Sequence, residues 1–155
     1  MTVSRNKFKK TLGSFATGVT IVTTCLNNKR HGLTVNAFSS LSMDPPLVLI
    51  CIDKKTESNR ILKQSKIFAI NILNKKQKNL SKIFSDPNNK NRFYGVKTTT
   101  KITGSPIIVN SLGYIDCTVE KMIPAGDHNI FIGKIKTLNS KNLDPLIYCR
   151  GNYLV

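Results

Sequence analysis

Short apolar runs, separated by polar turns rich in glycine and proline, dominate the hydrophobic pattern of this chain. The clearest run, 47–52 (LVLICI), follows Pro45 and Pro46 and predicts a buried strand. Further apolar or β-branched runs predict strands at 18–24, 33–38, 67–73, 107–109, 113–122, 130–137 and 146–149. About eight strands with few crossover helices predict a mainly β fold, namely a closed antiparallel barrel with added short helices.

Helical spacing of apolar residues predicts three short helices between these strands. The first begins after Ser4 as N-cap and runs to about Phe15, and the others cover 57–63 and 75–84. The polar stretch 27–32 predicts the turn of a hairpin, and 85–91 a loop rich in helix breakers. The pattern contains no repeat and no internal linker, which predicts a single domain over residues 1–155.

Length and cysteine usage narrow the class of protein. A chain of 155 residues can bury a sizeable core, and no apolar run approaches the roughly 20 residues of a membrane span. The N-terminus lacks the apolar stretch of a signal peptide, so the expected compartment is the cytoplasm. The four cysteines form no C-x-x-C pair, which predicts reduced thiols and no metal site.

The net charge of +16 raises the question of a nucleic-acid partner. The 24 basic residues, however, are scattered from Arg5 to Arg150 without an arginine-rich block or a DNA-binding motif. This distribution favours a solvated basic surface. The alternative is a surface that binds an anionic ligand, such as a phosphate-bearing cofactor.

The stretch before the buried strand is unusually rich in small hydrogen-bonding residues. Ala37, Ser39 and Ser40 would let a flat ring approach the backbone closely. Hydroxyls and cations that could bind a phosphate follow the strand, near the start of a predicted helix: Lys54, Lys55, Thr56, Ser58 and Arg60. A serine-rich strand end followed by a solvated basic helix is the alternative interpretation.

Other catalytic motifs are weak in this sequence. It has no nucleophile elbow, Walker loop or dinucleotide fingerprint. Asp127 and His128 could in principle serve a hydrolase. Because adjacent residues on an extended chain face opposite ways, we expect them not to cooperate.

Seven motifs occur in a specific order along nearly the whole chain: LGSFATGVTIVTT, GLTVNAFSSLSMDPPLVLICI, FAINIL, LSKIFS, RFYGV, GDHNIFIGKI and PLIYCRGNY. In this combination the chain resembles the short-chain flavin reductases that supply reduced flavin to two-component monooxygenases. The resemblance implies an FMN-binding split barrel, usually a homodimer, that oxidises NADH or NADPH and reduces FMN or FAD. It also implies a transient oxygenase partner.

The resemblance assigns expected roles residue by residue. The segment expected at the flavin ring is Thr34, Val35, Asn36, Ala37, Phe38, Ser39 and Ser40. The region expected at the ribityl chain and phosphate contains Cys51, Asp53, Lys54, Lys55, Thr56 and Ser58. Further expected cofactor contacts are Asn71, Arg92 and Phe93. The nicotinamide is expected at Gly126, Asp127, His128 and Tyr153, with His128 as the catalytic residue.

Each of the isolated residues also has a structural interpretation. Asn71 could be a strand-end residue, Arg92 a surface arginine, and Tyr153 a ring that closes the barrel. The predicted function is an NAD(P)H:flavin oxidoreductase. The alternatives are a non-catalytic flavin-binding module and, less favoured, a basic nucleic-acid-binding protein. The pattern is compatible with FMN or FAD and with NADH or NADPH.

Overall fold

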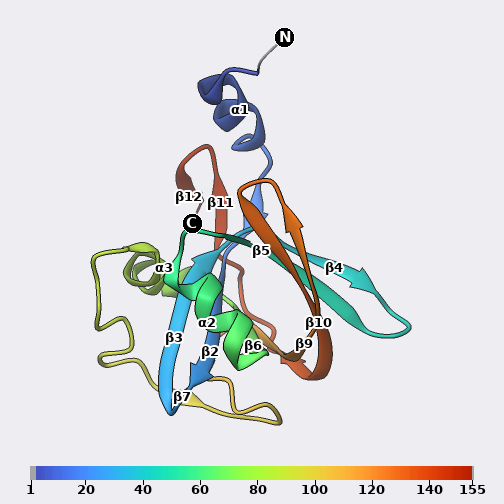
Figure 1. The fold of residues 1–155 in the computed structure, drawn as a ribbon. Helices are drawn as coiled ribbons and strands as arrows, with labels where there is room; N and C mark the ends of the chain where they lie inside the picture. The colour runs from blue at the N-terminus through green and yellow to red at the C-terminus, as the bar shows by residue number, and fades with distance from the viewer. Residues whose placement is uncertain (1–2, 155) are drawn as a thin grey trace.

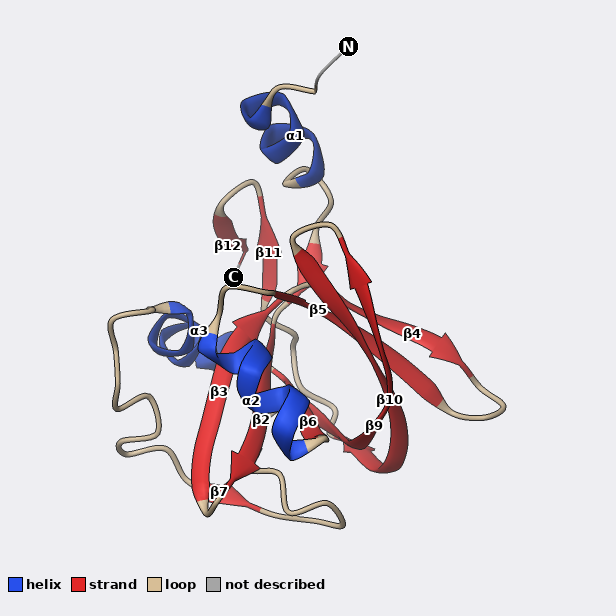
Figure 2. Cartoon of the chain, viewed as in Figure 1, coloured by secondary structure: helices blue, strands red, loops and turns tan. Residues whose placement is uncertain are grey.

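The computed structural model describes residues 3–154, and it confirms the mainly β class (Figures 1 and 2). The strands are β1 (Thr17–Gly18), β2 (Thr20–Leu26), β3 (Lys29–Val35), β4 (Phe38–Ser42), β5 (Leu47–Asp53), β6 (Ile67–Ile72), β7 (Thr98–Thr99), β8 (Ile107–Ile108), β9 (Gly113–Ala125), β10 (His128–Ser140), β11 (Ile147–Cys149) and β12 (Asn152–Leu154). The helices are α1 (Arg5–Leu12), α2 (Glu57–Ser65), the 3-10 helix η1 (Lys75–Gln77) and α3 (Lys78–Ser85).

A curled seven-stranded antiparallel sheet forms the body of the molecule, in the order β3-β2-β6-β9-β10-β5-β4. Among the strand pairings of residues 3–154, none joins the two edge strands, β3 and β4. The barrel is therefore split there, whereas the run of strands alone predicted a closed one. Helix α2 packs against β2, β3, β5 and β6 and so covers the inner side of the split (Figure 1).

The first hairpin turns more tightly than its polar sequence suggested. Asn27 and Asn28 both adopt left-handed backbone conformations, with φ of 51° and 60°. This pair is typical of a two-residue hairpin turn, so β3 already begins at Lys29. The serine-rich segment that follows is a separate strand, β4, which the pattern did not predict and which pairs with β5.

Two clusters of buried residues form the core. One lies inside the curled sheet and includes Phe68, Ile70 and Phe131. The other lies between the sheet and the segments around α3, and it includes Leu73 and Phe84. Period-two alternation on β5 and β10 places one face of each strand in the first cluster and the other face outside.

Helix α1 stands apart from this core at the top of Figure 1. Ser4 caps it as predicted, accepting a hydrogen bond from the Lys7 amide at 3.2 Å, but the helix ends at Leu12 rather than near Phe15. None of its residues is buried, and the side chains of Phe8 and Phe15 are exposed. Across residues 3–154 no helix is long and apolar enough to cross a membrane.

Candidate functional site

The serine-rich stretch lies where the chain leaves β3 and enters β4. Asn36 and Ala37 belong to neither strand, so their N–H groups stand outside the strand ladders. The Cys51 amide donates to the Ala37 carbonyl oxygen at 3.0 Å, which holds this break against β5. Ser39 and Ser40 are exposed, and the Ser39 hydroxyl donates to the Ser40 carbonyl at 2.9 Å. The stretch thus presents backbone and hydroxyl groups to the surface.

The other members of the stretch anchor it. Val35 is buried in the main core cluster, and Phe38 packs against the same cluster. The Thr34 hydroxyl donates to the Ser81 carbonyl in α3 at 2.7 Å. The apolar side chains therefore hold the segment against the core, while the backbone and hydroxyl groups at its surface remain accessible.

Strand register places His128 on the same face of the sheet as this stretch. Ser39 pairs with Leu49 of β5, and His128 pairs with Asp53 at the end of β5. The odd-numbered residues of β5, Cys51 among them, all point to the outer, partly exposed face. Leu49 and Asp53 are four residues apart, which corresponds to about 13 Å along a strand. Ser39, Cys51 and His128 therefore line one continuous face.

A cavity of about 670 Å³ opens on this face, between the end of α1 and the stretch. Its lining includes Thr17, Asn36, Ala37, Phe38, Ser39 and Cys51. The buried Thr17 hydroxyl has no hydrogen-bond partner within residues 3–154. A buried hydroxyl without a partner carries a desolvation cost, which a polar ligand in the cavity would relieve. Thr17 was not predicted at the site; the LGSFATG motif contains it without indicating where it lies.

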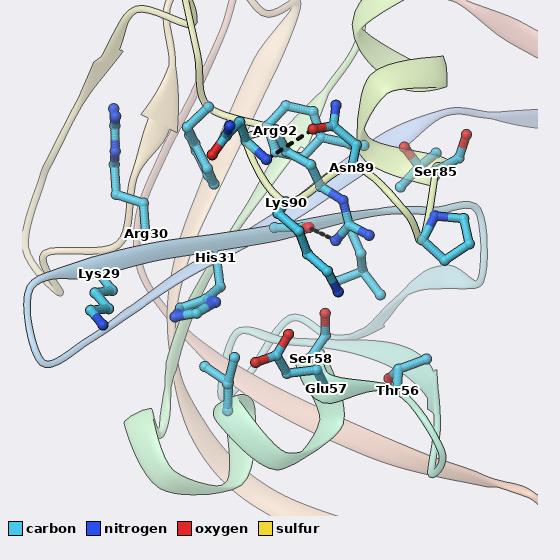
Figure 3. Close-up of a pocket in the computed structure, with 18 of the residues that line it drawn as sticks. Lys29, Arg30, His31, Thr56, Glu57, Ser58, Ser85, Asn89, Lys90 and Arg92 are labelled. Carbon is cyan, nitrogen blue, oxygen red and sulfur yellow. Dashed lines mark hydrogen bonds between the residues drawn. The ribbon is translucent and has the colours of Figure 1, made fainter.

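A larger groove of about 1170 Å³ lies between β3, the start of α2 and the loop after α3 (Figure 3). Six of the predicted cofactor residues line it: Thr34, Lys55, Thr56, Ser58, Arg92 and Phe93. In Figure 3, Lys90 projects into the groove towards Ser58 and Glu57, and His31 lies beside them. Of the described residues lining the groove, Glu57 alone is acidic, against Lys29, Arg30, Lys55, Lys90 and Arg92. The groove therefore suits an anionic ligand.

The turn between β5 and α2 is shaped by its own side chains. Asp53 accepts a hydrogen bond from the Lys55 amide at 2.8 Å through its carboxylate. The Thr56 hydroxyl donates to the Asp53 carbonyl at 2.8 Å and caps α2 by accepting from the Asn59 amide at 3.2 Å. These bonds hold Lys55, Thr56 and Ser58 at the rim of the groove.

Arg92 and Phe93 belong to the wall of the groove opposite α2, and both side chains already contact neighbouring protein groups. The Arg92 guanidinium donates to the Gly32 carbonyl at 2.9 Å and to the Asp86 carbonyl at 2.8 Å. The Phe93 ring stacks edge-on against Phe84 at 5.0 Å. A Cβ on Gly32 would lie 2.7 Å from the Phe84 ring, so only glycine allows this wall to approach β3. Arg92 thus ties the loop to β3.

His31 is a groove residue that was not predicted. Burial lowers the pKa of His31 below its ordinary value, and the nearby Glu57 carboxylate partly opposes this shift. His31 lies on β3, in the part of the sequence expected to be a turn. Its position in the groove depends on how β3 packs against α2.

The predicted Gly126-Asp127-His128 motif forms the turn between β9 and β10, beside the end of β5. The Lys54 amide donates to the Asp127 carbonyl at 3.0 Å, and the Lys54 ammonium donates to the Gly126 carbonyl at 2.6 Å. His128 Nδ1 donates to the Asp127 carboxylate at 2.7 Å. The expectation that these neighbours face opposite ways is wrong, because Asp127 lies in the turn and not on the extended strand. This hydrogen bond lowers the pKa of Asp127.

Two predicted residues lie elsewhere. Asn71 is fully buried, where its amide donates to the Ile21 carbonyl at 3.0 Å and its oxygen accepts from the Ile108 amide at 2.7 Å. It has no exposed surface with which to contact a cofactor. Tyr153 packs edge-on against Tyr148 at 5.2 Å, and its hydroxyl shares a 2.9 Å hydrogen bond with Ser81. Its contacts thus join β12 to β11 and α3.

Nine of the predicted residues line neither cavity: Val35, Ser40, Asp53, Lys54, Asn71, Gly126, Asp127, His128 and Tyr153. The break at Asn36–Ala37 and Cys51 near the end of β5 line the smaller cavity, and Lys55, just after β5, lines the larger groove. The fold therefore brings the smaller cavity, the anionic-ligand groove and the His128 turn together at one end of the β4–β5–β10 sheet.

Comparisons with known proteins show which proteins this chain is similar to. The profile of the flavin reductase-like domain matches residues 12–154. The reductase subunit HsaB of a flavin-dependent monooxygenase from Mycobacterium tuberculosis is 37% identical over 94% of this chain and 79% of its own. The structure of the flavin reductase PheA2 matches with a TM-score of 0.90 at 38% identity, covering 98% of this chain and 97% of that one. The Streptomyces globisporus NADH:FAD oxidoreductase SgcE6, solved with NAD and FAD fragments, matches with a TM-score of 0.93 at 28% identity, covering 98% of this chain and 92% of that one.

Proposed function

The chain belongs to the flavin reductase-like domain family and is an NAD(P)H-dependent flavin reductase, and from this premise we propose how its residues carry the reaction. The flavin ring lies over the smaller cavity, and the flavin phosphate lies in the groove at the start of α2. The nicotinamide lies beside His128. When bound, the flavin supplies the acceptor for the hydride that NAD(P)H donates.

Two features of the structure fit a flavin. The Thr17 hydroxyl, which lacks a partner among residues 3–154, lines the smaller cavity next to Asn36 and Ala37. A heteroaromatic ring with polar edges would satisfy that hydroxyl and cover the apolar lining at the same time. The adjoining groove offers cations and hydroxyls for a phosphate, with Lys55 and Thr56 at its rim.

The binding residues act through hydrogen bonds and charge. The N–H groups of Asn36 and Ala37 would hold the oxygen-bearing edge of the ring by donating hydrogen bonds to it, and donors placed there would favour the more negative, reduced flavin. Lys55 and Ser58 bind the phosphate, and the positive end of the α2 dipole adds to this attraction. The Thr56 hydroxyl holds the turn, because it already donates to the Asp53 carbonyl and accepts from the Asn59 amide. Arg92 acts indirectly, by holding the far wall of the groove against β3.

His128 orients the nicotinamide. Asp127 accepts the Nδ1 hydrogen of His128 and so holds the imidazole in one orientation. Nε2 on the other side of the ring is then available to the carboxamide of the nicotinamide. Hydride transfer needs the two rings at contact distance, and a residue that fixes one ring contributes by orientation.

The single observation that carries this proposal is the strand register that sets Ser39, Cys51 and His128 on one face. The test is steady-state oxidation of NADH and of NADPH with added FMN or FAD, together with a titration of flavin binding. Flavin binding without NAD(P)H oxidation would instead indicate a non-catalytic flavin-binding module. Salt-sensitive nucleic-acid binding in a protein that binds no flavin would indicate the third alternative.

The structure also supports a homodimer. Ile123 and Ile130 pair on the outer face of β9 and β10 and are only partly covered. Phe8, Leu12 and Phe15 are exposed at and after α1, and the latter two line the smaller cavity. A second copy would cover these apolar surfaces and deepen the flavin site. Light scattering should give twice the chain mass of 17.3 kDa; a 17.3 kDa particle that turns over NADH rapidly would contradict the dimer.

Reduced flavin passes from this protein to a partner monooxygenase, and we place the reaction in the cytoplasm. Both cavities open to solvent at the rim of the sheet, which suits release of the flavin after reduction. All four cysteines are free thiols, as expected in a reducing compartment. Reduction of many flavin molecules per protein, followed with a soluble electron acceptor, tests release; reduction of one flavin per chain would contradict it.

A further inference from the structure

Two buried asparagines connect the first turn of α2 to the first residues of β10. The Asn129 amide group donates to the Asn59 side-chain oxygen at 3.0 Å, and the Asn59 amide group donates to the Ile52 carbonyl at 3.2 Å. Both asparagines are 1% exposed. Asn129 follows His128 directly, and Asn59 follows Ser58. The bridge therefore joins the segment that binds phosphate to the segment that orients the nicotinamide.

The bridge is the buried side-chain contact at this corner. Because successive residues of a strand face opposite ways, His128 points outward while Asn129 points inward to α2. Lys54 makes the exposed contacts, from its ammonium to the Gly126 carbonyl and from its amide to the Asp127 carbonyl. Water competes for an exposed hydrogen bond, whereas a buried amide that loses its partner is left unsatisfied. The asparagine bridge therefore holds the turn more firmly.

From this geometry we infer that Asn59 and Asn129 are positioning residues, which set the distance between the phosphate end and the hydride-transfer end of the site. The inference rests on the proposed role of His128. Both asparagines are buried, so neither touches flavin or nucleotide. Their effect passes through the Asp127–His128 turn, whose displacement would misalign the nicotinamide relative to the flavin.

The test begins with Asn129→Ala in the full chain, with Asn74→Ala as matched control. Asn74 is also a buried asparagine, and its amide group donates a hydrogen bond of 2.7 Å to the Asn110 carbonyl. It lines neither cavity. Hydrogen exchange of the flavin-free protein, followed by mass spectrometry, should show faster exchange over 124–131 in Asn129→Ala than in Asn74→Ala. The FMN dissociation constant should change less than about 3-fold, because α2 keeps its Thr56 cap.

The functional measurement is a double-mutant cycle on the rate constant of anaerobic flavin reduction. Asn129→Ala should lower this rate constant about 10-fold in the parent, and less than about 2-fold when His128→Ala is already present. Such non-additivity is expected of a residue that acts through His128. Equal losses in the two backgrounds, or parental rate and exchange in Asn129→Ala, would overturn the inference.

Failure of a variant to fold, and failure of the proposed function itself, are distinguished from failure of the bridge as follows. If Asn129→Ala does not fold, the paired variant Asn59→Leu/Asn129→Leu takes its place, since removing both polar partners avoids leaving one unsatisfied. If that variant also fails to fold, the bridge serves folding alone and the inference is wrong. A parental rate in His128→Ala contradicts the proposed function, whereas matching exchange in Asn129→Ala and Asn74→Ala contradicts the bridge.

Discussion

Replacement of His128 with alanine should slow hydride transfer while leaving flavin affinity nearly unchanged. His128 lies at the turn between β9 and β10, and its side chain is 43% exposed. Its Nδ1 is already bonded to Asp127, so the nicotinamide can gain one hydrogen bond, at Nε2. The flavin contacts that we propose lie elsewhere, at Asn36 to Ser39 and along the groove.

The magnitude follows from this one contact. A hydrogen bond to a neutral group contributes about 1 kcal/mol, and the positioning of a reacting ring can raise the loss to about 2 kcal/mol. Partial exposure of the imidazole keeps the loss at this low end. Since each 1.36 kcal/mol changes a rate tenfold, the rate constant for flavin reduction should fall about 5- to 30-fold.

The assay is rapid anaerobic mixing of flavin-loaded protein with NADH, which separates reduction from reoxidation. His128→Asn retains a hydrogen-bonding side chain and should recover part of the rate. Asp127→Asn keeps an acceptor near Nδ1 and should cost less than His128→Ala. A folded His128→Ala protein that reduces flavin at the parental rate and binds NADH equally well would refute the reasoning, and the nicotinamide would then lie elsewhere.

Four further predictions concern the cavity, the groove and the core. Ser39→Trp should fill the ring site and weaken FMN binding at least 10-fold with the fold intact by circular dichroism, and parental affinity would show that the ring lies elsewhere. Thr17→Val should leave the unfolding midpoint unchanged or higher, because it removes a hydroxyl without a partner, yet weaken FMN binding about 5-fold for one lost hydrogen bond. In the folded state the pKa of His31 is lowered below 6.5, so the contribution of the neutral imidazole to stability is complete above pH 6.5 and is lost as the pH falls. His31→Gln should therefore show a smaller drop in denaturation midpoint between about pH 7 and 5 than the parent. An identical drop in both proteins would contradict this. Burial raises the pKa of Cys117 to about 12, so in the folded protein iodoacetamide at about pH 8 should alkylate Cys117 at least 100-fold more slowly than after unfolding.

Local patterns were sufficient for most secondary-structure elements. The length of continuous apolar runs identified β5 and β6 within about one residue, and Thr56 and Lys66 bound a helix close to the predicted one. Ser4 as N-cap was read correctly because capping depends on a few neighbouring residues. Errors occurred where one residue's backbone conformation decides the chain's path, as at Asn27 and Asn28, whose left-handed conformations start β3 early.

The candidate cofactor region came mostly from the order of motifs. Asn36 to Ser39, Cys51 and the Lys55 to Ser58 region line the two cavities. The resemblance placed Asn71 at the cofactor, but an asparagine near a strand end has the same sequence signal whether it faces a ligand or, as here, satisfies buried backbone groups. Arg92 was ambiguous for the same reason, and the structure has its guanidinium on backbone carbonyls.

The sequence by itself determined most of the longer strands, where helices begin and which short motifs carry polar chemistry, because apolar runs, caps and turns are properties of neighbouring residues. Tertiary structure decided which motifs meet. The pairing of His128 with Asp53, the outward face shared with Ser39 and the bridge from Asn129 to Asn59 all depend on strand register between distant segments. Register is set by packing across the whole sheet, and a shift of one residue would turn His128 inward and Asn129 outward.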